Sequence, residues 1–206
     1  MDKTIKPKKY DFSLIEGISK KQLNEHYKLY EGYVNNLNKI LQILQEKTIL
    51  TTGTTYSEAR SLALGETYAL NGTKLHELYF ENMGNSKKQP TGLVLKWILR
   101  DYGSFEQWKR RFIEYALSVR GWVVYTFDPI DMKTHIIGQD AHDVGSVWRS
   151  TPLLVLDVYE HAYMIQFGID RKAYIDVFFK NIEWDIVNQR AAESMFASLM
   201  LTYSNR

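Results

Sequence analysis

The chain has 206 residues and a net charge of +2, and it contains no cysteine. This length suits one large domain or two small ones, and the lack of cysteine excludes disulfides and thiolate metal sites. The small charge and the dispersed lysines and arginines argue against a nucleic-acid partner. No run approaches the roughly 20 apolar residues of a membrane span, and no signal peptide is visible, so we expect a soluble, cytoplasmic protein.

The first half of the chain predicts two long helices. Residues 19–49 carry apolar and aromatic side chains at three- and four-residue steps, as on one face of a helix, and Ser19 is a suitable N-cap. After the loop "TTGTTYS", Ser57 can cap a second helix over residues 56–83, although "LNGT" leaves an interruption open. The segment "GNSKKQPTG" has the composition of a linker, and we place a domain boundary between residues 86 and 87.

The second half predicts two capped helices, three strands and further helices. "TGLVLKWILRDYG" and "SFEQWKRRFIEYALSV" are helical, whereas "GWVVYTFDPIDMKTHIIGQD" contains two β-branched and aromatic runs around the turn "DPIDMK". "PLLVLDV" is a third strand, and the remainder is helical to about residue 200. The expected fold class is α+β: an N-terminal helical hairpin (residues 1–86) followed by a C-terminal α/β domain (residues 87–206) with a three-stranded antiparallel sheet.

The stretch "LLVLDVYEHAYMIQFGIDRKAY" places ionisable residues inside an apolar run. A buried carboxylate such as Asp157 requires a charged or hydrogen-bonding partner, because desolvation is costly. A metal cation is one such partner, and the four-residue spacing from Asp157 to His161 allows both side chains to reach one ion. The other interpretation is that Asp157 caps the following helix and His161 pairs with Glu160.

The chain has five histidines, which differ in their surroundings. His26 shares a predicted helix face with Tyr33, and His76 lies among apolar residues; each taken alone would more often be a hydrogen-bonded core histidine. His135 and His142 are expected to be structural or solvated. Three histidines and one aspartate in aromatic surroundings form a nitrogen and oxygen ligand set that suits zinc, manganese or non-haem iron.

Several motifs of the sequence resemble those of one known protein family. "DVYEHAY" closely resembles the "DVWEHAY" signature of the iron/manganese superoxide dismutases. "LNEHYKLYEGYVNNLN" and "LHELYFENM" look like the first two helices of that family, and "YGSFEQWKRRFIEYALSVRGWVVY" and "YIDVFFKNIEWDIVNQR" look like parts of its C-terminal domain. The resemblance covers nearly the whole chain, and the helical hairpin followed by an α+β domain is also the fold of this family.

The resemblance implies one iron or manganese ion per subunit. The metal ligands it implies are His26, His76, Asp157 and His161. Tyr33 would be the gateway tyrosine at the active site. Gln139, in "IIGQD", resembles the glutamine that hydrogen-bonds solvent at the metal, and Gly72 would leave room for it. Trp122 and Tyr159 would form aromatic walls.

The resemblance also implies self-association as a homodimer or a tetramer. Glu160 would reach across a two-fold axis to the partner subunit's His161, and Tyr163 would belong to the same interface. Such a bond would hold the ligating imidazole in one orientation. Dimer and tetramer remain open alternatives.

Some positions depart from the family pattern. His26 and Tyr33 are seven residues apart, where the family has eight; counting back eight gives Glu25, and we prefer His26 because imidazole is the expected ligand. Four further positions differ from the family pattern around the site: Leu29, Tyr30, Leu75 and Val124. Whether full activity survives these changes is left open by the sequence.

The implied activity is conversion of superoxide to O2 and H2O2, with a metal that alternates between its trivalent and divalent states. The alternatives are a mononuclear non-haem iron or manganese oxidase and a non-catalytic subunit on the same fold. The sequence does not distinguish iron from manganese, because both metals use the same ligand types.

Overall fold

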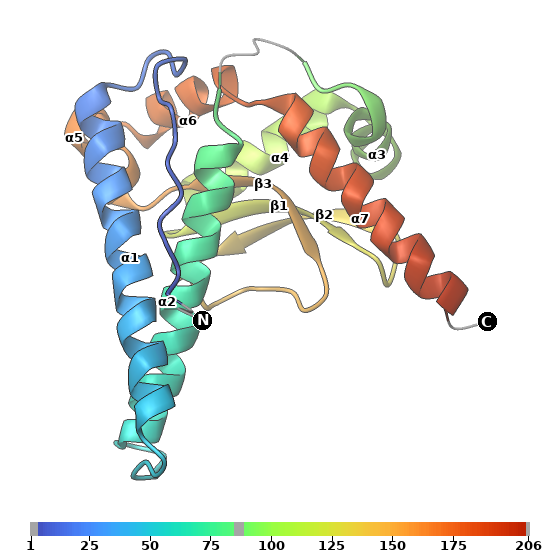
Figure 1. Ribbon diagram of the computed structural model, residues 1–206. Helices are drawn as coiled ribbons and strands as arrows, with labels where there is room; N and C mark the ends of the chain where they lie inside the picture. Colours follow the sequence, from blue (N-terminus) through green and yellow to red (C-terminus); the bar gives the residue numbers. More distant parts are fainter. Residues whose placement is uncertain (1–3, 85–88, 205–206) are drawn as a thin grey trace.

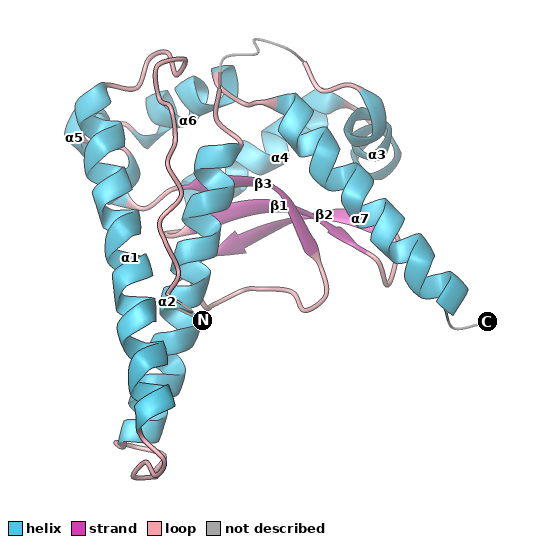
Figure 2. Cartoon of the chain, viewed as in Figure 1, coloured by secondary structure: helices cyan, strands magenta, loops and turns pink. Residues whose placement is uncertain are grey.

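The computed structural model describes residues 4–84 and 89–204, with side chains described to residue 200. An N-terminal helical region is followed by a sheet with helices around it (Figures 1 and 2), which confirms the α+β class. The elements in chain order are α1 (Lys20–Glu46), α2 (Glu58–Glu81), α3 (Gly92–Tyr102), α4 (Phe105–Ser118), β1 (Trp122–Asp128), β2 (Lys133–Gln139), β3 (Thr151–Asp157), the 3₁₀ turn η1 (Glu160–Ala162), α5 (Met164–Phe167), α6 (Arg171–Lys180) and α7 (Trp184–Ser204).

Helices α1 and α2 form the predicted hairpin, and both begin at the expected caps. The Ser19 hydroxyl accepts a hydrogen bond from the Gln22 amide, and the Ser57 hydroxyl accepts one from the Arg60 amide. Each serine thus satisfies an amide that the first helical turn leaves unpaired. Helix α2 is continuous through "LNGT", so the interruption left open by the sequence does not occur. Packing against α1 outweighs the low helix propensity of Gly72.

The three strands form an antiparallel sheet in the order β2-β1-β3. In its register, Trp122 at the start of β1 lies opposite Gln139 on β2 and opposite Asp157 on β3. The carboxyl ends of β2 and β3 therefore flank the first residue of β1. Trp122, Gln139 and Asp157 therefore lie side by side at one end of the three strands, close to the helical hairpin.

Buried polar bonds join the hairpin to the sheet. The Asn82 side chain, at the end of α2, accepts a hydrogen bond from the Val155 amide at 2.8 Å and donates to the Val155 carbonyl. The Arg190 guanidinium, on α7, donates to the Leu153 carbonyl at 3.0 Å. These bonds fix the position of α2 relative to β3.

The predicted boundary between residues 86 and 87 lies outside the described residues, so the division into 1–86 and 87–206 stays a prediction. Within the part of the chain that the structure describes, no helix combines the length and apolarity of a bilayer crossing.

Candidate metal centre

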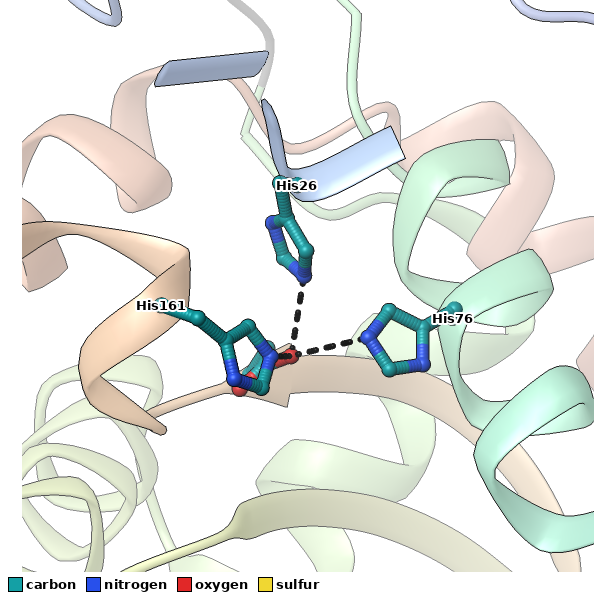
Figure 3. Close-up of side chains that lie close together, drawn as sticks. His26, His76 and His161 are labelled. Carbon is teal, nitrogen blue, oxygen red and sulfur yellow. Dashed lines mark hydrogen bonds and ion pairs between the residues drawn. The ribbon is translucent and has the colours of Figure 1, made fainter. Parts of the chain in front are cut away.

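Three imidazoles surround one buried carboxylate oxygen (Figure 3). His26 comes from α1, His76 from α2, Asp157 from the end of β3, and His161 from the 3₁₀ turn that follows. The Nε2 atoms of His26, His161 and His76 lie 3.0, 3.1 and 3.5 Å from Asp157 Oδ2. One ligand atom from each of the four residues lies within 4.8 Å of all the others. The structure therefore brings together all four predicted ligands.

The orientation of His76 tests whether a metal fits this cluster. Its Nδ1 lies 2.6 Å from the Gly72 carbonyl, and a carbonyl only accepts, so Nδ1 carries the proton. Burial lowers the pKa of His76 well below its ordinary value, so the ring is neutral and Nε2 presents a lone pair. That buried Nε2 has no hydrogen-bond partner. A lone pair that faces a carboxylate oxygen needs a cation between them.

The state of Asp157 supports the same conclusion. Its side chain is fully buried, which by itself would raise its pKa, but His161 and His26 together hold the pKa well below its usual range. Oδ1 accepts a hydrogen bond from the Tyr159 amide at 2.9 Å, which leaves Oδ2 directed at the imidazoles. One anionic oxygen and three imidazole nitrogens form a donor set that suits iron or manganese.

The positions of His26 and Glu25 favour His26 as the ligand from α1. Glu25 is exposed and pairs with Lys28 at 2.7 Å, whereas His26 is buried and directed at Asp157. Helix α1 is α-helical along its whole length, and seven residues make almost two full turns. His26 and Tyr33 therefore lie on the same face of α1 despite the short spacing.

Tyr33 contacts the cluster and a histidine that the sequence did not assign to the site. Its ring lies 5.2 Å from that of His76, and its hydroxyl lies 2.7 Å from His142 Nε2. His142 is fully buried, so of the two roles expected for it, structural or solvated, the solvated one does not occur. Burial lowers its pKa from 6.5 to about 4, which keeps the ring neutral near pH 7.

Trp122 sets the tautomer of His142. The indole Nε1–H only donates, and it lies 2.8 Å from His142 Nδ1. Nδ1 must therefore accept, which places the single ring proton on Nε2. Nε2 then donates to the Tyr33 oxygen, and the hydrogen of the Tyr33 hydroxyl remains to be donated elsewhere.

The Gln139 side chain is buried and bonds to a serine in the loop that follows β2. Its amide nitrogen donates to Ser146 Oγ at 3.1 Å, and its side chain lines a separate pocket of about 240 Å³ with Val124 and Leu75. His142, three residues later, contacts Tyr33 instead. Gly72 leaves room for the Tyr33 ring rather than for a glutamine, because a Cβ there would lie 2.9 Å from Tyr33 Cδ1.

Aromatic rings enclose the cluster as expected. The Trp122 ring meets that of His76 edge-on at 5.0 Å, and the Tyr159 ring stacks on that of His161 at 5.2 Å. Aromatic walls of this kind exclude water and lower the local dielectric constant. His135 lies apart from the cluster and pairs with Asp131.

The two residues predicted for an interface have different surroundings. Glu160 is exposed, and Met164 and Ile165 nearby are also exposed apolar residues. Tyr163 is only 4% exposed, and its hydroxyl accepts a hydrogen bond from Arg171 Nε at 3.2 Å. Within one chain, only Glu160 of this pair is free to reach a neighbouring molecule.

Comparison with known proteins finds one family. Residues 90–190 match the family described as iron/manganese superoxide dismutases, C-terminal domain. A superoxide dismutase [Fe] of Aquifex aeolicus is 36% identical over 89% of this chain and 88% of the relative. A superoxide dismutase [Mn] of Haloarcula marismortui is 36% identical over 87% of this chain and 88% of the relative. A superoxide dismutase [Fe] of Pyrobaculum aerophilum is 28% identical over 96% of both chains.

Proposed function

This chain belongs to the iron/manganese superoxide dismutase family, and we propose that it is a metal-dependent superoxide dismutase that converts superoxide to O2 and H2O2. It would use one iron or manganese ion per subunit. The observation that best supports the proposal is the buried Nε2 of His76. It has no hydrogen-bond partner and lies 3.5 Å from Asp157 Oδ2. The names of relatives that cover most of the chain favour a dismutase over an oxidase or a non-catalytic subunit.

His26, His76, Asp157 and His161 would hold the ion. When bound, the ion supplies a one-electron reservoir that alternates between its trivalent and divalent states. Asp157 contributes one negative charge and the three neutral imidazoles contribute none, so the site keeps a net positive charge that attracts the superoxide anion. Asp157 Oδ1 stays bonded to the Tyr159 amide, which holds the carboxylate in place.

Tyr33 and His142 would manage protons beside the ion. Two superoxide anions and two protons yield one O2 and one H2O2, so each cycle must deliver two protons. The Tyr33 ring lies against that of His76, and its hydroxyl carries a proton close to the proposed metal site. His142 fixes the position of that hydroxyl from the other side at 2.7 Å. In this proposal His142 takes the role that the sequence analysis gave to Gln139.

We further propose that the protein is a homodimer joined near the metal centres. The Nε2 of His161 is directed at Asp157, which leaves Nδ1 for a second bond. The exposed Glu160 carboxylate of a neighbouring subunit can accept that N–H across a two-fold axis. Exposed Met164 and Ile165 would add apolar contact area. The tetrameric alternative and the cytoplasmic location stay predictions.

Elemental analysis and a superoxide-decay assay test the function together. The purified protein should contain about one equivalent of iron or manganese and should accelerate superoxide decay. Asp157→Ala should lose the metal, because it removes the only anionic ligand. Glu25→Gln is the matched control: it changes an exposed carboxylate next to His26 and should retain both metal and activity. A metal-loaded wild-type protein without dismutase activity would refute the proposal.

A further inference from the structure

Tyr68 lies at the outer side of the Tyr33 and His142 pair. It is on α2, two turns before His76, and it is 38% exposed. Its ring meets that of His142 at 4.4 Å and that of Tyr33 at 6.1 Å. Tyr68 therefore contacts both the half-buried Tyr33 and the buried His142 and also reaches the surface of the chain.

The hydrogen-bond direction leaves the hydrogen of the Tyr33 hydroxyl available for transfer, and its oxygen can still accept from a further donor. Trp122 donates to His142, and His142 donates to the Tyr33 oxygen, so Tyr33 must donate its own hydrogen to another group. The ring of Tyr68 lies 6.1 Å from that of Tyr33, so Tyr68 is a hydroxyl-bearing neighbour of Tyr33. Tyr68 thus lies beside the hydrogen-bonded pair of Tyr33 and His142.

The proposed reaction requires a route by which Tyr33 regains protons. His142 is a poor source, because its Nδ1 accepts a hydrogen bond from the Trp122 indole and therefore carries no proton. Its one proton is already committed to the Tyr33 oxygen. A hydroxyl beside Tyr33 that also meets solvent is the suitable donor.

We propose that Tyr68 passes protons from solvent to Tyr33, and that it is a positioning residue acting through Tyr33. Each of the two protons that H2O2 takes up passes in the same way: Tyr33 releases its hydroxyl proton to the reduced oxygen, Tyr68 transfers its own proton to the Tyr33 oxygen, and a proton from the solvent buffer restores Tyr68. The electron comes from the metal ion in the proposed dismutation. This inference rests on the proposed function, but its central measurement does not require turnover.

The test compares Tyr68→Phe with Tyr56→Phe. Tyr68→Phe removes one hydroxyl and keeps the ring against His142; Tyr56→Phe removes a hydroxyl from a tyrosine that is 92% exposed in the loop between α1 and α2. The hydroxyl exchange of Tyr33 with solvent is measured by NMR, from the deuterium isotope shift of its Cζ carbon. Protein loaded with diamagnetic gallium(III) in place of iron(III) is used.

Exchange at Tyr33 should slow about tenfold or more in Tyr68→Phe and stay unchanged in Tyr56→Phe. In the iron or manganese protein, turnover at saturating superoxide should fall in Tyr68→Phe. Its solvent deuterium isotope effect should rise, and added imidazole buffer should restore the rate. Metal content and the unfolding midpoint should match those of the wild type.

Unchanged Tyr33 hydroxyl exchange in Tyr68→Phe would overturn the inference. A loss of turnover without a change in isotope effect or rescue by buffer would also overturn it, because it would indicate a purely structural role. If the wild-type protein shows no superoxide decay, the proposed function fails, yet the exchange measurement still decides whether Tyr68 is the proton route to Tyr33.

Discussion

Replacing His142 with glutamine should remove part of the rise in stability that the metal-free protein shows between pH 4 and pH 6.5. Burial lowers the pKa of His142 from 6.5 to about 4. In this interval the unfolded chain binds a proton at this residue and the folded chain does not, so the free energy of unfolding increases with pH. The contribution is fully present above pH 6.5 and is lost as the pH falls toward 4.

The size of the effect follows from the same values. Each pKa unit corresponds to about 1.4 kcal/mol, so the lowering to about 4 gives about 3 kcal/mol across the interval. Glutamine is a suitable replacement because its oxygen can accept from Trp122 and its nitrogen can donate to Tyr33, but it does not titrate. The four ligand residues titrate in both proteins, so the difference between the two profiles isolates His142.

Urea unfolding at several pH values, with a chelator present, measures this difference. The gap between the wild-type and His142→Gln unfolding free energies should change by about 3 kcal/mol in favour of the wild type as the pH rises from 4 to 6.5. Parallel profiles across that interval would refute the argument that His142 is buried and neutral.

Two further substitutions test the interface and the packing. Glu160→Ala should weaken dimerisation and lower metal affinity about 10–100-fold, as seen when bonds that orient a ligand are lost; light scattering and a metal titration measure both, and a fully metallated dimer would show that the interface lies elsewhere. Gly72→Ala should displace the Tyr33 ring, since its Cβ would lie 2.9 Å from Tyr33 Cδ1, and reduce turnover at unchanged metal content. Gly65→Ala, on the same helix, meets only the flexible end of Ile40 and is the control, so equal activity in both variants would contradict the steric argument.

Local patterns in the sequence were sufficient to predict most of the fold. Ser19 and Ser57 cap helices as expected because capping depends on residues within one turn. The three strands follow from β-branched and aromatic runs separated by turn residues. The unbroken course of α2 through Gly72 could not be predicted in this way, because it depends on the ring of Tyr33 from another helix.

The four proposed ligands were predictable from the family resemblance, in which "DVYEHAY" contains Asp157 and His161 and the two upstream helices contain His26 and His76. His142 was not, because it lies in the polar loop "QDAHDVGS", and its partners Trp122 and Tyr33 are 20 and 109 residues away in the chain. Gln139 was chosen because "IIGQD" resembles the family segment that contains the glutamine. One signal was present: Trp122 is a buried donor at the start of a strand, and such a donor requires an acceptor nearby.

Helix α2 organises both the proposed metal site and the route to it. Tyr68, Gly72 and His76 are spaced by four residues, so they follow one face of the helix in successive turns. His76 belongs to the proposed ligand cluster, the Gly72 carbonyl accepts a hydrogen bond from His76 Nδ1–H, Gly72 leaves space for Tyr33, and Tyr68 reaches the surface. A small rotation of α2 would therefore disturb the ligand, the gateway tyrosine and the proton route together. The bonds from Asn82 to β3, at the end of the same helix, resist this rotation, which connects the packing of the two parts of the chain to the chemistry between them.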